Sequence, residues 1–251
     1  MYITLKHECQ VKVILMKNKV LHIIVCLILA FSSTVMGTNI DSLRRLYNSA
    51  SHDTTKINLC QEMQYAYCEN LRWDSALIFS EKAIELAEGN ENSNTMMNIY
   101  YYQGLAFYRK GNVDNALKSY LKALEIAKNI KSVSQPFILN EIGVFYKAQG
   151  NYPKAIEYFQ QNLEFAEKAK DTVMIGRTLN NMANVYYSYG IFQKSIEYYD
   201  KAIVIFSKIK KENLVAFLYM NMGLSYKKVN QNAKALESFN KSKELFTLLK
   251  I

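Results

Sequence analysis

The stretch GVFYKAQGNYPKAIEYF, residues 143–159, has a small residue, an aromatic residue three positions later, a glycine, and then an alanine followed four positions later by another aromatic residue. The same spacing recurs at residues 104–120, 183–199 and 223–239. Residues three or four apart share one face of a helix, so each copy places small and aromatic side chains on one face of two successive helices. The stretch therefore predicts a helical hairpin that is repeated along the chain.

Five copies of this unit follow one another at spacings of 40, 39, 40 and 40 residues. The small residue of the first helix stands at Gln64, Gly104, Gly143, Ala183 and Gly223. The second helix begins its pattern with a small residue, in repeat order Ala76, Ala116, Ala155, Ser195 and Ala235. Four positions later stand Ser80, Tyr120, Phe159, Tyr199 and Phe239. Three positions after these stand Ala83, Ala123, Asn162, Ala202 and Ser242. A pattern that recurs five times in one register indicates a repeat architecture.

The residues between the two helices of each unit suit a tight turn. Glycine or asparagine tolerates the left-handed conformation that ends a helix, and these residues stand at the break, at Gly111, Gly150, Gly190 and Asn230. Asn112 and Asn151 can then cap the next helix, and Pro153 fits its first turn. Small residues allow two helices to approach closely, with the aromatic rings filling the adjoining space. One hairpin cannot bury its apolar face alone, so the pattern predicts an all-α fold of stacked antiparallel helix pairs.

This pattern resembles the tetratricopeptide repeat, which has a Gly or Ala, a Tyr, and an Ala with an aromatic residue four positions on. The resemblance covers residues 53–250 and implies a right-handed α-solenoid of five repeats, with boundaries near 53–91, 92–131, 132–170, 171–210 and 211–251. The period exceeds the usual length of about 34 residues, so we expect both helices to be about one turn longer. The proline that closes the usual repeat is absent, which leaves the helices free to run on between units. Repeat 1 fits the pattern least well.

Two segments resemble narrower groups within this family. RTLNNMANVYYSYG, residues 177–190, resembles the long repeats of the kinesin light chain. IDSLRRLYNSASHDTTKINLCQEM, residues 40–63, together with the segment that precedes it, is similar to exported repeat regions of Bacteroidetes proteins. In that group such a region often precedes a membrane helix and a histidine kinase or DNA-binding output domain.

The segment before the repeats has the layout of a secretory signal. Residues 16–37, MKNKVLHIIVCLILAFSSTVMG, begin with two lysines, continue with about a dozen apolar residues and end with small and polar ones. We expect cleavage after Gly37 and a periplasmic or secreted protein; the alternative is an uncleaved membrane anchor with the repeats on the exported side. Residues 1–15 are interpreted as a mis-called start, and residues 38–52 as a short helix and linker.

The net charge of +9 does not indicate a nucleic-acid-binding protein. Residues 38–205 carry 18 basic and 18 acidic side chains, whereas residues 206–251 carry nine basic and three acidic ones. Nucleic-acid binding requires a focused basic surface, and this mild excess near the C-terminal end predicts an ordinary solvated helix face.

The sequence contains few residues suited to catalysis or metal binding. After Gly37 the only histidine is His52, in a polar stretch, and there is no glycine-rich phosphate loop or nucleophile elbow. Cys60 and Cys68 lie eight residues apart in a predicted helix, which places their backbones about 12 Å apart, too far for a disulfide. We expect two free, packed cysteines, no cofactor, no metal site and no enzymatic activity.

The candidate binding residues lie on the first helices, which line the concave face in solenoids of this type. An asparagine side chain has both donors and an acceptor, so it can pair with a peptide backbone without reading its sequence. In the families resembled, asparagines at these places contact bound peptides; Asn180 and Asn181 match directly, and Asn140 and Asn221 match in part. The predicted peptide-binding set is Asn140, Lys147, Arg177, Asn180, Asn181, Asn184, Asn221 and Lys227, with Tyr101, Tyr102 and Tyr108 offered by repeat 2. The alternative is that the asparagines are exposed to solvent without a binding role and that the tyrosines pack in the core.

Three functions remain open from the sequence. The first is an exported, non-enzymatic scaffold that binds a protein or peptide, with an acidic segment or a terminal carboxylate facing the flanking cations. The second is the sensory region of a truncated signalling protein, either a histidine kinase or a DNA-binding regulator. The third is a membrane-associated assembly factor held by an uncleaved N-terminal segment. The end of repeat 5 is apolar at Phe246, Leu248, Leu249 and Ile251, which predicts a further repeat, a partner or a homodimer there.

Overall fold

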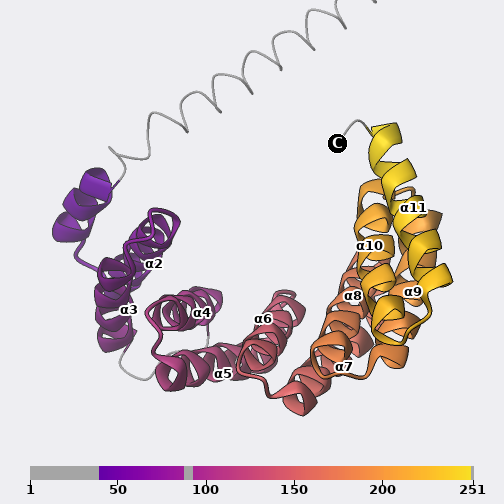
Figure 1. Ribbon diagram of the computed structural model, residues 1–251. Helices are drawn as coiled ribbons and strands as arrows, with labels where there is room; N and C mark the ends of the chain where they lie inside the picture. Colours follow the sequence, from indigo (N-terminus) through magenta and orange to yellow (C-terminus); the bar gives the residue numbers. More distant parts are fainter. Residues whose placement is uncertain (1–39, 88–92, 250–251) are drawn as a thin grey trace, which may run out of the picture. The chain divides into compact units, whose positions relative to one another are not determined.

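The computed structural model describes residues 40–87 and 93–249, and all secondary structure in these residues is helical (Figure 1). The predicted signal at residues 16–37, the predicted mis-called start at residues 1–15 and the C-terminal Ile251 lie outside the described residues. The predicted all-α fold of stacked helix pairs is confirmed.

Within residues 40–87 and 93–249, one short helix, residues 40–49, precedes ten longer ones. In chain order these are α2 (Asp53–Glu69), α3 (Trp73–Ala87), α4 (Asn94–Arg109), α5 (Val113–Asn129), α6 (Gln135–Ala148), α7 (Tyr152–Ala169), α8 (Thr172–Ser188), α9 (Phe192–Lys208), α10 (Glu212–Lys228) and α11 (Asn232–Leu249).

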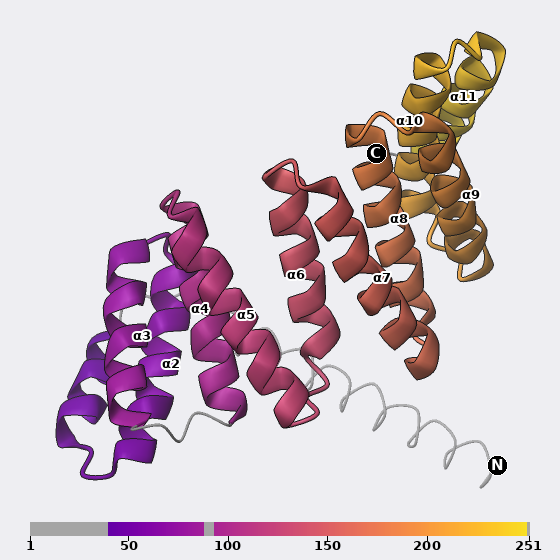
Figure 2. The same cartoon turned by 90° about the horizontal axis from the view of Figure 1, so that it is seen from below.

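The chain divides into two compact units, and helix α4 contributes to both. The described part of unit 1 comprises residues 40–87 and 105–111, and that of unit 2 comprises residues 93–104 and 112–249. In unit 1, α2 packs against α3. In unit 2, each helix from α5 onward packs against the next (Figure 2). Helix α6 also touches α8, the first helix of the following repeat. This contact brings the first helices of repeats 3 and 4 side by side.

Residues in the left-handed conformation end the helices at regular intervals. Within the repeats these residues are Leu71, Gly111, Gly150, Gly190 and Asn230, and after the second helices they are Lys131, Lys170 and Lys210. The expectation that helices run on between units is therefore wrong. A single left-handed residue closes α5, α7 and α9 in place of the missing proline, since this conformation cannot continue a right-handed helix.

Polar side chains begin several helices as the sequence indicates. The side-chain oxygen of Asn112 accepts a hydrogen bond from the backbone N–H of Asn115 at 3.3 Å, and that of Asn151 accepts one from the N–H of Lys154 at 3.2 Å. Pro153 lies in the first turn of α7. These caps satisfy backbone donors that have no partner within the helix.

The small residues of the first helices lie directly against aromatic rings of the second helices. A Cβ added at Gly143 would lie 2.8 Å from the ring of Phe159, and one at Gly104 or Gly223 would lie 2.7 Å from Tyr120 or Phe239. Any side chain larger than hydrogen would force the ring to move at these places. The close approach of the paired helices explains why glycine recurs in this register.

In repeat 1 the larger side chain of this contact stands on the first helix and the smaller one on the second. Gln64 occupies the place of the glycine and Ser80 that of the aromatic residue, and both are fully buried. Cys60 and Cys68 of α2 are free and buried, as predicted. Burial raises the pKa of Cys60 to about 11 and that of Cys68 to about 12, so both remain neutral thiols at neutral pH.

Candidate binding site

A cavity of about 310 Å³ opens between α6, α7 and α8 in unit 2. Its volume is at the lower end of the range for ligand pockets. It is lined by Pro136, Phe137, Asn140, Asn162, Asp171, Val173, Met174, Arg177, Thr178, Asn180 and Asn181. We call it the α6–α8 cavity.

A second cavity, of about 220 Å³, lies next to the first and involves α8, α9 and α10. Arg177 and Asn180 line both cavities. The second cavity is completed by Phe206, Leu214, Phe217, Leu218 and Asn221. We call it the α8–α10 cavity. Both shared side chains belong to α8, so this helix borders the α6 residues of the first cavity and the α10 residues of the second.

The two cavities bring together most of the peptide-binding residues predicted from the sequence. Asn140, Asn180 and Asn181 line the α6–α8 cavity, Asn221 lines the α8–α10 cavity, and Arg177 lines both. The other three predicted residues, Lys147, Asn184 and Lys227, line neither cavity. Asn184 is engaged within its own repeat, where its side-chain oxygen accepts a 2.6 Å hydrogen bond from the Tyr199 hydroxyl.

Hydrogen bonds hold some of the cavity amides and leave others available. The Asn181 Nδ2 donates to the Asn140 Oδ1 at 2.8 Å, and the Asn140 Nδ2 donates to the Glu141 Oε1 at 3.1 Å. These bonds orient two amides from neighbouring repeats. Within residues 40–87 and 93–249, the side chains of Asn180 and Arg177 have no hydrogen-bond partner, so both can pair with a ligand.

Asn162 of α7 lines the α6–α8 cavity and was not predicted from the sequence. Its side chain is only 2% exposed, and its Oδ1 has no hydrogen-bond partner in the described structure. A signal was present, because three of the other four repeats have alanine at this place. Asn162 lies on a second helix, whereas the residues predicted from the sequence lie on first helices.

The rim of the α6–α8 cavity combines apolar and charged groups. The Phe137 side chain is 54% exposed, and Val173 is also exposed, so together they offer an apolar wall. Asp171 and Arg177 supply opposite charges. The Asp171 carboxylate is already engaged, because it accepts a 2.9 Å hydrogen bond from the N–H of Met174 as the cap of α8. Arg177 is thus the cation that is free to meet an anionic group of a ligand.

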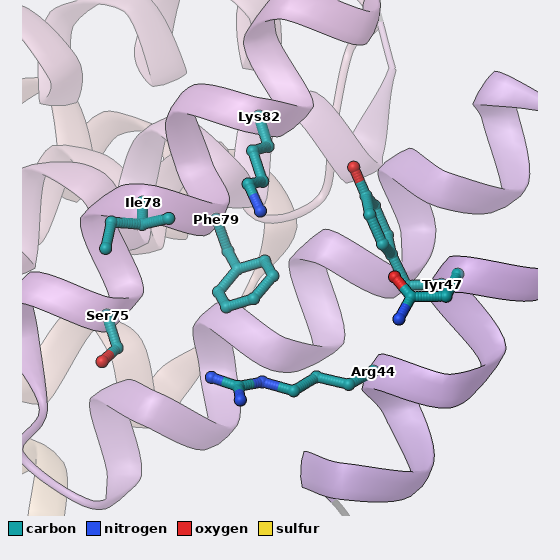
Figure 3. A pocket seen from close by; sticks show the side chains of 7 residues that line it. Arg44, Tyr47, Ser75, Ile78, Phe79 and Lys82 are labelled. Atoms are coloured by element: carbon teal, nitrogen blue, oxygen red, sulfur yellow. The ribbon is translucent and has the colours of Figure 1, made fainter.

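A separate cavity of about 230 Å³ lies in unit 1, between the helix at residues 40–49 and α3 (Figure 3). Lys82 extends over the rings of Tyr47 and Phe79, with its Nζ 5.7 Å and 5.1 Å from the ring centroids. Arg44 donates a 2.9 Å hydrogen bond to the Tyr67 hydroxyl. Both cations are therefore occupied by aromatic partners within the unit, and they act here as structural contacts.

The described residues show no cluster of three or more side chains suited to hold a metal ion. In the same part of the chain, no helix combines the length and the apolar character needed to cross a bilayer.

Models of the tetratricopeptide repeat match residues 98–130, 135–206 and 174–247. Several solved structures are also similar. The nearly identical repeats of a Podosopora anserina protein assigned as a kinesin light chain share 15% identity and a TM-score of 0.67, covering 78% of this chain and 97% of that one.

Two further structures come from proteins with longer chains. A signal-transduction ATPase with numerous domains and a tetratricopeptide repeat sensor, from Pyrococcus horikoshii, is 22% identical with a TM-score of 0.70, covering 88% of this chain and 37% of that one. A Rap protein in complex with Competence and Sporulation Factor is 15% identical with a TM-score of 0.57, covering 82% of this chain and 58% of that one.

Proposed function

Since the chain belongs to the tetratricopeptide repeat family, we propose that it is a non-enzymatic scaffold that binds an extended peptide segment across α6, α8 and α10. The observation that carries this proposal is the gathering of Asn140, Arg177, Asn180, Asn181 and Asn221 around two adjoining cavities. These side chains come from three successive repeats, so a linear ligand is the shape that reaches all of them.

The chemistry of the two cavities suits a peptide. Unpaired asparagine amides can donate to and accept from a peptide backbone. Phe137 and Phe217 are exposed beside them and offer apolar contact to side chains of the ligand. Arg177 supplies a guanidinium that favours an acidic side chain or a terminal carboxylate nearby. The similar Rap protein was solved with Competence and Sporulation Factor bound, which supports a binding role for this fold.

We further propose that the scaffold is exported and acts in the periplasm or outside the cell. The signal-like composition of residues 16–37 supports this, and a membrane-anchored form with exported repeats is the alternative. A cleavage assay settles which form exists: N-terminal sequencing of the protein recovered from cells is expected to begin at Thr38. Recovery of a chain that retains residues 16–37 would favour the anchored form.

A second candidate function is signal input. The similar Pyrococcus horikoshii protein has its repeats as a sensor within a signal-transduction ATPase. The proposed binding face would then receive the signal, and the output would come from another domain or another protein.

The binding proposal is tested with a double variant, Asn180→Ala with Asn181→Ala, against a library of immobilised random nonapeptides. The double variant removes one unpaired amide and the donor that holds Asn140. We expect the affinity for the peptides that the unaltered protein enriches to fall at least about tenfold, the effect of losing one to two net hydrogen bonds.

The matched control is Asn240→Ala, which removes an exposed asparagine of α11 that lines neither cavity. This control is expected to bind like the unaltered protein. Equal binding by the double variant and the unaltered protein would show that the ligand does not use this face.

A further inference from the structure

One register place on the first helices alternates between an aromatic residue and a cation. Six positions before the small residue stand Phe137 in α6, Arg177 in α8 and Phe217 in α10, which we call the Arg177 row. The Phe137 and Phe217 side chains are 54% and 48% exposed, whereas phenylalanine is usually buried. Each ring contacts one aromatic neighbour, Tyr101 or Phe246, and leaves the rest of its surface open.

The two cavities place the cation of this row between the two rings. Phe137 lines the α6–α8 cavity, Phe217 lines the α8–α10 cavity, and Arg177 lines both. Arg177 is exposed, and within the described part of the chain its side chain has neither a hydrogen-bond partner nor an ion-pair partner. A ligand that crosses α6, α8 and α10 through the cavities therefore meets an apolar, a cationic and an apolar group in that order.

Charge determines where a carboxylate of the ligand can lie. The Asp171 carboxylate lines the α6–α8 cavity, where it would repel a second carboxylate. Among the described residues that line the α8–α10 cavity, Arg177 is the only charged one, and Asn180 and Asn221 add amide N–H donors. A ligand carboxylate is therefore favoured at Arg177 on the side that faces α10.

Apolar groups flank this position on both sides. Phe137 and the exposed Val173 line the α6–α8 cavity, and Phe217 and the half-buried Leu214 line the α8–α10 cavity. Apolar side chains of a ligand that cover these groups remove apolar surface from water, which stabilises the complex.

A second register place on the first helices has the opposite alternation. Four positions after the small residue stand Lys147, Tyr187 and Lys227, which we call the Lys147 row. Lys147 lies ten residues after Phe137, which is about 15 Å along the helix axis, so an extended chain that crosses the helices follows one row or the other. Neither Lys147 nor Lys227 lines a cavity. The cavities therefore favour the Arg177 row.

We infer that the bound peptide carries an acidic residue between two apolar residues, with the acidic residue at Arg177 and the apolar residues at Phe137 and Phe217. This inference rests on the proposed peptide-binding function and adds to it the order of residues in the ligand. Packed helices lie about 8–10 Å apart, and an extended chain advances about 3.3 Å per residue. The acidic residue is therefore expected about three positions from each apolar one.

The test begins with random nonapeptides that are acetylated at one end and attached to beads by the other, so that neither terminus is charged. The peptides enriched by the unaltered protein are expected to share the order apolar, acidic, apolar. Fluorescence anisotropy then compares the best peptide with an analogue that has glutamine in place of the acidic residue. A permuted peptide of the same composition, with the acidic residue outside the two apolar ones, is measured beside them. We expect both altered peptides to bind at least about fivefold more weakly, the upper range for an exposed ion pair.

Arg177→Gln removes the charge of the row, and Arg45→Gln is the matched control at an exposed arginine of the helix at residues 40–49, outside the cavities described above. Arg177→Gln is expected to bind the acidic peptide and its glutamine analogue equally, whereas Arg45→Gln keeps the preference for the acidic peptide. In the unaltered protein this preference should shrink as the salt concentration rises, which a purely structural role of Arg177 would not produce.

An undiminished preference in Arg177→Gln, or enriched peptides without an acidic residue, would overturn the inference and leave the peptide-binding function standing. Enrichment of the order acidic, apolar, acidic, with the preference lost in Lys227→Gln, would overturn it in the same way and move the ligand to the Lys147 row. A screen in which the unaltered protein enriches no peptide would overturn the proposed function and the inference together.

Discussion

The hairpin of α2 and α3 and the hairpin of α6 and α7 have the same register but opposite internal packing. In the second, Gly143 lies under the ring of Phe159, whereas in the first the corresponding places hold Gln64 and Ser80. All four residues are buried. A long side chain on the first helix with a short one on the second therefore substitutes for glycine with an aromatic ring.

The comparison shows that the helix pair requires a combined volume at the contact and not a particular residue at either place. Protein interiors are close-packed, so an increase on one helix has to be met by a decrease on the other. The same reasoning explains why repeat 1 fits the family pattern poorly by sequence and yet forms the same hairpin.

The largest effect is expected from Phe159→Ala. This change empties the space against Gly143, which has no side chain with which to fill it, and should lower the free energy of unfolding by about 3–5 kcal/mol. Ser80→Ala at the same place in repeat 1 should cost only about 1 kcal/mol or less, because the Ser80 hydroxyl donates to Leu77 O within its own helix. Urea denaturation followed by circular dichroism measures both. Equal losses of the free energy of unfolding for the two variants would show that Phe159 and Ser80 fill the same share of the contact in their hairpins.

An intermediate effect is expected from converting repeat 1 to the packing of repeat 3. Ser80→Phe alone should destabilise the protein by about 1–3 kcal/mol, since the new ring meets Gln64 in a space that is already filled. Adding Gln64→Gly should recover much of this loss, because it recreates the pair found at Gly143 and Phe159. A double variant no more stable than Ser80→Phe, in the same denaturation experiment, would refute the exchange of volume between the two places.

The smallest effect is expected at the turns of the two hairpins. Leu71 and Gly150 both adopt the left-handed conformation, with φ of 57° and 72°. Leu71→Gly should stabilise the protein by about 0.5 kcal/mol. Glycine relieves the strain of the left-handed conformation in the folded state, but it also raises the conformational entropy of the unfolded chain, which offsets part of this gain. Gly150→Ala should destabilise it by about 1 kcal/mol for the opposite reason. The Leu71 side chain is 69% exposed, so little burial is lost. A fall in melting temperature for Leu71→Gly would mean that this side chain has a stabilising contact.

Much of the candidate site could be predicted because it follows from helical periodicity. Asn140 and Asn180 occupy one matching place in repeats 3 and 4, and Asn181 and Asn221 occupy the next in repeats 4 and 5, so a shared register puts each pair on matching helix faces. Asn184 could not be placed in this way. It lies one turn after Asn180, but its amide turns to the Tyr199 hydroxyl, and that partner belongs to the second helix of its repeat. Periodicity assigns a face and not a hydrogen-bond partner.

The sequence by itself determined the repeat, the glycine and asparagine turns within the repeats and the close helix contacts, because each depends on residues a few positions apart whose size, backbone freedom and capping groups act locally. Only the tertiary structure decided which amides remain unpaired and where cavities open. Asn162 illustrates the difference: its departure from alanine is visible in the sequence, but its missing donor depends on what α6 and α8 bring beside it. Hydrogen-bond satisfaction is a property of the packed neighbourhood, and it is fixed only once the helices are assembled.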